Sequence, residues 1–295
     1  MCDGSFVKQL KKYRVPYFFI MPFFILFLVF QLIPTIWTFY ISMTSWKGIG
    51  TPKYCGFQNY QKMIVDNMFW ESLFNTLIYW ISGLVFILIL SLFLASLLNS
   101  TSLVKGKSMF KTAVFLPYVC AAIAVGMIFK MLFDENVGLV NEVLLLSGIK
   151  KIPWLTNSKM SKFPVIILIL WRFTPWFTMI IYSGLLNIPK DYYEAASIDG
   201  GGILQQFFYI TLPSLKNILF FCSITITVDM WKLFNESYIL AGPGTSNTSL
   251  FQYMYESGFG VFNMGYASAI GVILIAILVV LSIIQFFTRR GQGEL

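Results

Sequence analysis

The sequence predicts an all-α membrane protein with six transmembrane helices, and three observations support that fold class. Only 12% of the 295 residues are charged and 57% are hydrophobic, whereas about a quarter of the residues in a soluble domain are charged. The mean hydropathy is +0.74. The apolar residues form six continuous runs, each close to the ~20 residues that a helix needs to cross a bilayer. Strands of a membrane barrel would be shorter and would alternate.

The six runs follow one another along the chain with polar segments between them. Because the first run is too long for the core of a cleaved signal peptide, we expect it to remain as a helix. We expect a cytoplasmic N-terminal segment (1–16), a transmembrane domain (17–287) and a cytoplasmic tail (288–295). The runs cover approximately Tyr17–Tyr40, Leu73–Leu98, Thr112–Phe133, Pro164–Leu186, Ser214–Phe234 and Gly265–Phe287.

Basic residues predict the orientation in the membrane. Six spans place both ends of the chain on one side, and Lys and Arg prefer the cytoplasmic side. KQLKKYR precedes the first span, and KGKSMFK before the third span contains three lysines and no acid. We therefore expect both termini in the cytoplasm of a bacterial cell, with the chain in its plasma membrane. The net charge of +8 is then explained by these flanking residues, and no nucleic-acid partner is expected.

Several kinds of catalytic and cofactor site are excluded by what the sequence lacks. There is no histidine, which argues against both His-based triads and zinc hydrolysis. Gly106-Lys107-Ser108 resembles the end of a phosphate-binding loop, but the motif G-x-x-x-x-G-K-[ST] requires glycine where Thr101 stands. We expect no enzyme activity, bound cofactor or metal in this chain. If the protein uses ATP, another chain must bind it.

The most informative polar segment, residues 187–213, lies between the fourth and fifth runs. Pro189 suits the first turn of a helix, Asp191 and Glu194 suit its positive N-terminal end, and Gly200–Gly202 would end it. An amphipathic segment follows and reaches Pro213, which opens the fifth span. We expect a cytoplasmic helix–turn–helix with an acidic tip of small residues. An interfacial linker is the alternative, but carboxylates favour docking to protein over binding to anionic lipid.

This segment also resembles the signature of a known family. E-A-A, three residues, G, nine residues and I-x-L-P form the cytoplasmic motif of the membrane subunits of binding-protein-dependent ATP-binding-cassette importers. In that family the loop is a coupling helix that sits in a groove of a separate ATPase subunit. The sequence matches every position of the motif. The resemblance, together with the neighbouring acid, implies these coupling residues: Glu194, Ala195, Ala196, Asp199, Gly200, Ile210, Leu212 and Pro213.

The resemblance extends along nearly the whole chain and points to the carbohydrate-uptake group. CGFQNYQKMIVDNMFWESLFNTLIY, FKTAVFLPYV and YMYESGFGVFNMGYASAI are similar to segments of the subunit that corresponds to the larger maltose permease subunit. The resemblance implies import of a sugar or short oligosaccharide delivered by an extracytoplasmic binding protein. It also implies a second, related permease subunit as a heterodimer partner and two cytoplasmic ATPase subunits. ILAGPGTSNTSL departs from the usual pattern of the group. Because that segment is expected outside, the departure concerns binding-protein docking or substrate identity.

Ionisable residues inside spans are costly and suggest function. Arg172 and Asp229 are expected to pair across a cavity, or one of them to contact substrate; a purely structural ion pair is the alternative. Lys232 and Glu236 are four residues apart and are expected to pair on one helix. By resemblance to sugar transporters, whose aromatic rings stack on sugars, the pathway residues are Tyr118, Arg172, Phe173, Trp176, Asp229, Met230 and Leu233.

Two kinds of alternative remain open. The same machine could carry glycerol phosphate or another solute, since Arg172 and Asp229 would also suit a charged or phosphorylated cargo. A secondary transporter driven by ions is the other alternative. It should show inverted repeats and interrupted helices, and neither is evident in the sequence. A membrane-embedded enzyme would need a convergent catalytic set, which the sequence does not offer.

Overall fold

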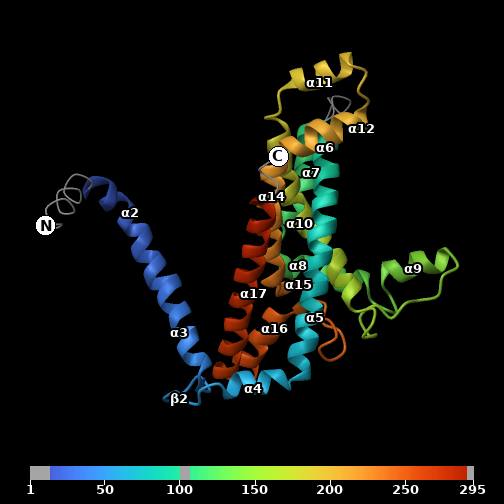
Figure 1. The fold of residues 1–295 in the computed structure, drawn as a ribbon. Coiled ribbons are helices and arrows are strands. Elements are labelled where there is room, and N and C mark those ends of the chain that lie inside the picture. The colour runs from blue at the N-terminus through green and yellow to red at the C-terminus, as the bar shows by residue number, and fades with distance from the viewer. Residues whose placement is uncertain (1–13, 100–106, 291–295) are drawn as a thin grey trace, which may run out of the picture. The chain divides into compact units, whose positions relative to one another are not determined.

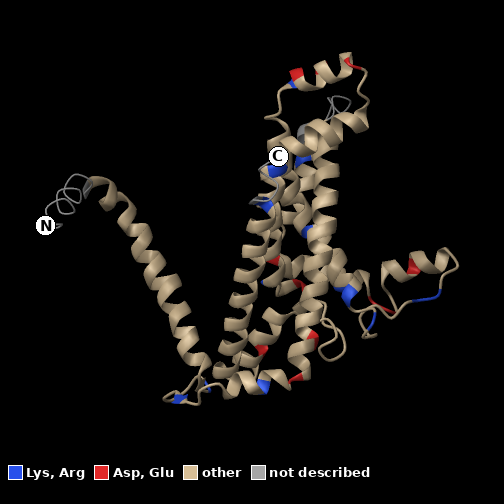
Figure 2. Cartoon of the chain, viewed as in Figure 1, with Lys and Arg blue, Asp and Glu red and all other residues tan. Residues whose placement is uncertain are grey.

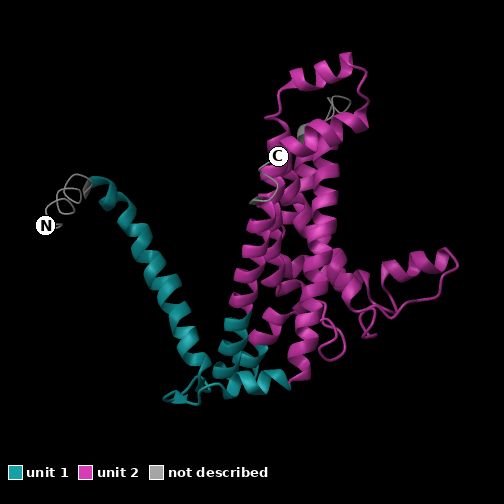
Figure 3. Cartoon of the chain, in the orientation of Figure 1, with its two compact units in different colours: residues 1–65, 256–273 teal, residues 66–255, 274–295 magenta. Residues whose placement is uncertain are grey.

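The computed structural model describes residues 14–99 and 107–290. The chain divides into two compact units, one of residues 1–65 with 256–273 and the other of residues 66–255 with 274–295 (Figure 3). The predicted N-terminal segment, the basic segment KGKSMFK and the predicted tail lie partly outside the described residues, as does Thr101 of the rejected phosphate-loop motif.

The first unit contains a long apolar helix. Its three parts continue one another as a candidate membrane span, Val15–Ser42, in agreement with the first predicted span. In the most apolar stretch of 18 residues within this span, no residue is buried. Within the first unit, this helix is therefore not covered by other elements. The parts are α2 (Arg14–Phe27), π-helical η1 (Leu28–Leu32) and α3 (Ile33–Ser42).

A small cap follows this helix in the first unit. The amide of Asn59 donates to the carbonyl oxygens of Ser42 and Thr44, at 2.8 and 2.9 Å. Gly265 lies so close that a Cβ there would stand 2.0 Å from the Thr44 oxygen, and only glycine fits. The cap consists of the antiparallel strands β1 (Thr44–Ser45) and β2 (Lys53–Tyr54), α4 (Gln58–Ile64), π-helical η5 (Glu256–Gly260) and the start of α17 (Met264–Arg290).

The second unit is a helical bundle around α10, which packs against α6, α7 and α14. Its core consists of fully buried apolar side chains such as Tyr79, Leu168 and Phe177. Charged residues are sparse along the bundle and gather towards helix ends and connections (Figure 2). Its elements are α5 (Asn67–Ser82), π-helical η2 (Gly83–Ile87), α6 (Leu88–Asn99), α7 (Lys107–Val119), α8 (Ala122–Leu132), α9 (Leu139–Leu146), α10 (Lys162–Leu185), α11 (Lys190–Ile198), α12 (Ile203–Gln206), π-helical η4 (Phe207–Thr211), α13 (Leu212–Ser214), α14 (Lys216–Trp231), α15 (Asn235–Ile239), α16 (Leu250–Tyr255) and the part of α17 from Leu274 on.

Five of the predicted spans correspond to long apolar helices, but the third does not form one straight helix. α7 and α8 meet at an angle of 92°, because Ala121 between them takes an extended conformation with ψ 125°. Close packing holds α8 in its new direction: a Cβ at Gly126 would lie 2.7 Å from Ile239 of α15. The structure thus contains an interrupted helix. The sequence did not reveal this interruption, so its absence from the sequence is no argument against an ion-driven carrier.

Candidate functional site

The predicted helix–turn–helix of residues 187–213 is present as α11 and α12 at one end of the second unit (Figure 1). α11 begins after Pro189, which has the extended conformation of an N-cap residue, with ψ 134°. Glu194 and Ala195 are exposed on this helix and Ala196 is half-buried. Acidic residues mark α11 in Figure 2. The motif E-A-A therefore lies on an accessible helix at the tip of the bundle.

The consecutive glycines end this helix. Gly200 and Gly201 are each required there, but for different reasons. The N–H of Gly200 donates to the carbonyl of Ser197 at 3.2 Å, and that of Gly201 donates to Ala196 at 2.7 Å. This pair of bonds is the Schellman motif, which requires a left-handed residue after the helix. Gly200 supplies that conformation with φ +81°. A Cβ at Gly201 would lie 2.8 Å from the Ala196 carbonyl oxygen, so this position needs glycine for space.

A second set of bonds ties the returning segment to α11. Gln206 donates from Nε2 to the Ser197 hydroxyl at 2.9 Å and to the Gly201 carbonyl at 3.1 Å. The hydroxyls of Tyr193 and Thr211 are 2.9 Å apart. A cavity of about 150 Å³ remains beneath the loop, lined by Ser96, Asn99, Leu185, Tyr193, Ile203, Gln206, Phe207 and Thr211. The loop is thus closed on itself and anchored to the bundle at its base.

The predicted coupling residues divide into a tip and a base. Asp199, the C-cap of α11, is exposed beside the E-A-A motif. Ile210 lies in η4, where its carbonyl accepts the Ser214 hydroxyl at 2.6 Å. Leu212 and Pro213 begin α13, just before α14. The tip therefore offers carboxylates and a small methyl surface, while I-x-L-P forms the helical connection into the bundle.

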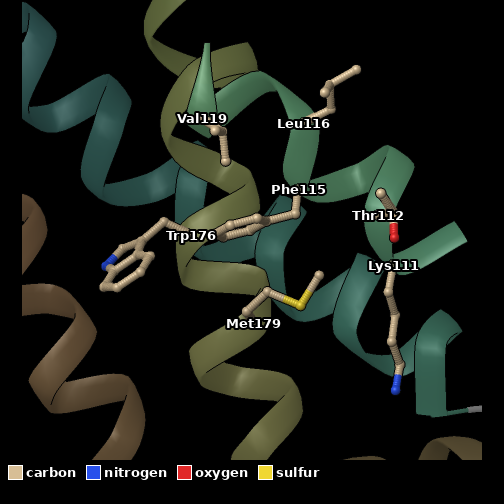
Figure 4. A pocket seen from close by; sticks show the side chains of 7 residues that line it. All are labelled: Lys111, Thr112, Phe115, Leu116, Val119, Trp176 and Met179. Atoms are coloured by element: carbon tan, nitrogen blue, oxygen red, sulfur yellow. The ribbon is translucent and has the colours of Figure 1, made fainter. Parts of the chain in front are cut away.

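Two of the predicted pathway residues, one on α7 and one on α10, are in contact. The rings of Tyr118 and Trp176 stack at 5.0 Å between centroids with an interplanar angle of 18°. Phe115 stands 6.5 Å from Trp176. Phe115 and Trp176 border an open, mainly apolar cavity of about 460 Å³ (Figure 4). Its lining residues are Lys111, Thr112, Phe115, Leu116, Val119, Trp176 and Met179.

The half-buried arginine of α10 has a different partner from the one predicted. Arg172 donates from Nη1 to Glu236, whose side chain is almost fully buried. The predicted pair of Arg172 with Asp229 is wrong, and so is the predicted pair of Lys232 with Glu236. The reason is that α14 ends at Trp231. Lys232 and Glu236 are therefore not on one helix, and the separate helix α15 turns Glu236 towards α10.

The remaining pathway candidates lie around this ion pair or in the core. Asp229 is half-buried and within electrostatic range of Lys232, Arg172 and Glu236. The Arg172 guanidinium stands 5.4 Å from the centre of the Phe173 ring. Met230 and Leu233 belong to the buried core, where Met230 occupies the space beside Gly83. In this structure both residues pack the bundle.

Most of the segment from Leu240 to Leu250, part of the connection predicted to lie on the outer side of the membrane, is packed into the bundle. Residues 246–250 are buried. The Asn75 amide donates to the carbonyls of Thr245 and Thr248 at 2.9 and 3.0 Å. Asn247 accepts the N–H of Gly242 at 2.9 Å and donates to the carbonyl of Leu240. The signal that sequence reasoning missed was a polar Asn-Thr pair within the second apolar run.

Three curated relatives cover nearly the whole chain. The arabinooligosaccharides transport system permease protein AraP of Bacillus subtilis is 35% identical over 289 residues, which is 96% of this chain and 91% of the relative. The lactose transport system permease protein LacF of Rhizobium radiobacter is 32% identical and covers 93% of both chains. The trehalose/maltose transport system permease protein MalF of Thermococcus litoralis is 29% identical, over 99% of this chain and 100% of the relative.

Solved structures share the fold. A bacterial ABC transporter involved in the import of the acidic polysaccharide alginate aligns with a TM-score of 0.86 at 20% identity, over 99% of this chain and 100% of that chain. An alginate ABC transporter in complex with a pentasaccharide-bound periplasmic protein aligns with a TM-score of 0.85 at 21% identity, over 97% and 98% of the two chains. A family model matches residues 10–291. The chain therefore belongs to the family described as binding-protein-dependent transport system inner membrane component.

Proposed function

We propose that this chain is a transmembrane subunit of an ATP-driven importer for a sugar or short oligosaccharide. In this proposal an extracytoplasmic binding protein delivers the cargo, and separate cytoplasmic subunits hydrolyse ATP. The observation that carries the proposal is the closed loop of α11 and α12, which presents Glu194, Ala195 and Asp199 outward. Membership of the family supports it, as do the sugar-transport names of the relatives.

The geometry of this loop suits the transfer of force. The Schellman bonds at Gly200 and Gly201 and the Gln206 bridge keep α11 and α12 together. Through η4 and α13 the loop continues into α14, which packs against α10 in the bundle. A push or pull on α11 would therefore reach the membrane helices as a movement of a rigid body. Both termini would then be in the cytoplasm, on the side of the loop.

A second permease subunit completes the proposed machine. One chain supplies one such loop, whereas two ATPase subunits would each need one. The apolar window of Val15–Ser42 is unburied within the chain, so this helix is available for a related but different permease as well as for lipid. Together with two ATPase subunits and a binding protein, such a heterodimer is the assembly we propose.

The proposed cargo path runs along α7 and α10. Tyr118, Trp176 and Phe115 offer ring faces on neighbouring helices, and aromatic faces with a few polar groups suit the binding of sugars. Conversion between inward-facing and outward-facing states would move these helices with the coupling loop. The interruption between α7 and α8 lies directly after Tyr118 in the chain, where such a movement could be accommodated.

The test is co-purification of the chain from native membranes, with Glu194→Lys as the variant. We expect the wild type to bring down an ATPase and a sister permease, identified by mass spectrometry. Glu194→Lys should keep the sister permease and lose the ATPase, because a reversed charge faces the ATPase groove. The matched control is Glu142→Lys, which makes the same charge change on the exposed face of α9 and should retain both partners.

Transport then separates this proposal from an ion-driven carrier. Uptake of sugar should stop when ATP hydrolysis is blocked while ion gradients persist. If the chain purifies alone in every variant, or if uptake continues without ATP hydrolysis, the proposed function is wrong.

A further inference from the structure

We infer that the cargo of this importer is an electrically neutral glycan and that Glu236 sets this selectivity by neutralising Arg172. The inference rests on the proposed function and names the substrate class. It concerns the charged residues of α10, α14 and α15, of which Glu236 is buried. An arginine within a membrane span would favour phosphate or uronate groups in the cargo. In this structure, however, Nη1 of its guanidinium already pairs with an acidic residue from the same chain.

The charges in this region balance. Arg172 of α10 is bound to Glu236 of α15. Asp229 of α14 lies within electrostatic range of Lys232, at the end of the same helix, and of both members of the pair. Two basic and two acidic groups therefore balance to a formal charge of zero, with Lys232 exposed and the other three partly or fully buried. An anionic cargo would meet two carboxylates as well as two cations here and would gain no net attraction.

Displacing the internal partner would also be costly. Glu236 is 3% exposed, so its carboxylate cannot turn to bulk water if an anion takes its place on Arg172. A buried carboxylate without its partner is strongly unfavourable. A hydroxyl group carries no charge and can hydrogen-bond beside the pair without separating it. The geometry therefore penalises acidic sugars and leaves neutral ones unaffected.

The cavity bordered by Phe115 and Trp176 also suits a neutral glycan. Its lining is mainly apolar apart from Lys111 and Thr112. The Lys111 ammonium stands 4.5 Å from the centre of the Tyr182 ring, and in Figure 4 it points away from Trp176. Stacked rings bind the C–H faces of sugars without any charge. The cavity thus provides contact surface for a neutral ring, with its cation held by an aromatic partner at the edge.

The first experiment measures uptake by the complete importer, purified with its partner subunits and reconstituted in proteoliposomes with its binding protein. The probes are neutral oligosaccharides (arabinotriose, maltotriose and lactose), an acidic one (trigalacturonate) and glycerol 3-phosphate. We expect ATP-dependent uptake of at least one neutral probe, at least tenfold faster than either anion. Faster or equal uptake of an anion overturns the inference and leaves an ATP-driven importer standing. No ATP-dependent uptake of any probe overturns the proposed function and the inference with it.

A second experiment tests Glu236 at the permease itself, because a binding protein also selects cargo. Trigalacturonate is enclosed with ATP in the proteoliposomes, and its inhibition of neutral uptake is measured. We expect no inhibition in the wild type or in Glu236→Asp, and at least fivefold inhibition in Glu236→Gln, where Arg172 is left uncompensated. The double variant Arg172→Gln with Glu236→Gln should again be insensitive, a pattern that loss of packing alone would not produce.

Two results would overturn the assigned role of Glu236. One is inhibition of the wild type by the acidic sugar; the other is an assembled Glu236→Gln importer that stays insensitive. If Glu236→Gln does not assemble, the wild-type inhibition measurement and the uptake panel still decide the inference. Glu142→Gln, which removes the exposed partner of Lys151, is the matched control and should behave as the wild type.

Discussion

The loop of α11 and α12 and the segment Leu240–Leu250 are both glycine-containing connections between helices, yet they are held in opposite ways. In the first, Gln206 bonds to residues nine and five positions away. In the second, Asn75 bonds to Thr245, 170 positions away, and Asn247 reaches the Ser161 carbonyl, 86 positions away. One connection is stabilised mainly by its own neighbours and the other by the rest of the bundle.

The difference shows how the two connections divide their tasks. A loop with local bonds keeps its shape while its outer surface stays exposed, so it can be offered to a partner. A segment whose polar groups are satisfied by distant helices is buried and joins those helices to one another. We therefore expect changes in Leu240–Leu250 to affect stability, and changes in the α11–α12 loop to affect coupling with little effect on stability.

The largest effect is expected from Asn247→Ala. The side chain accepts one backbone N–H and donates to two carbonyls in the buried segment. Each buried partner left unsatisfied costs about 1–3 kcal/mol, so we expect a loss of about 3–5 kcal/mol in stability. A thermal melt of the purified protein in detergent should show a midpoint roughly 10 °C lower. Asn136→Ala, at an exposed site, should leave the midpoint unchanged. Equal shifts in both variants would contradict the division of tasks between the two connections.

A smaller and different effect is expected from Gly200→Val. Its φ of +81° is a conformation that costs an L-residue about 1–2 kcal/mol, and more for a β-branched one. Because the strain is confined to the exposed turn, we expect ATP-dependent uptake and ATPase association to fall at least tenfold with little change in melting temperature. Gly200→Asn, which tolerates this conformation, should retain most of both.

Gly202→Ala is the matched control for this turn. Its φ is −73°, and a Cβ there would come no closer than 3.9 Å to the Gln205 side chain, so the variant should couple normally. Loss of coupling in Gly202→Ala as severe as in Gly200→Val would show that the left-handed turn is not what matters.

The smallest effect is expected at the connection after α8, which is also closed by local bonds. The N–H groups of Val137 and Asn136 donate to the Asp134 carboxylate, at 3.0 and 2.8 Å. These bonds hold the pKa of Asp134 below its ordinary value of 3.8. Because the charged form is favoured in the folded state, the contribution to stability is complete above about pH 4. It is lost as the pH falls through the lowered pKa.

Hydrogen exchange of residues 134–149 would measure this contribution. Asp134→Ala should exchange faster than the wild type at pH 7, and the difference, corrected for intrinsic rates, should vanish as the pH falls below the lowered pKa. A difference that persists unchanged in acid would mean that the carboxylate charge does not close this turn.

The coupling loop could be predicted from sequence because its bonds are local. Pro189 and Gly200 each have one well-defined use at the start and end of a helix, and the structure places Pro189 as the N-cap of α11 and Gly200 in the left-handed turn after it. The partner of Arg172 could not be predicted in this way. Asp229 and Glu236 are both acids close to the fifth span, and the choice between them depends on where α14 ends and on the direction of α15.

The bend between α7 and α8 is a further feature that could not be predicted from the sequence. The run from Thr112 to Phe133 is apolar throughout, and hydropathy alone does not distinguish a straight helix from a broken one. Only the close approach of Gly126 to Ile239 shows what keeps α8 turned away. Likewise, Asn75 in an apolar run indicated a polar contact without identifying the segment that it binds.

The sequence by itself determined that the chain is a helical membrane protein, where most of its spans lie and how the exposed loop is built. These properties follow from hydropathy, from helix capping and from the conformational freedom of glycine, which all act within a few residues. The tertiary structure alone decided which acid neutralises Arg172, that the third span is broken and that Leu240–Leu250 turns inward. These three depend on contacts between distant helices, since a buried polar group must find a partner wherever the packing brings one.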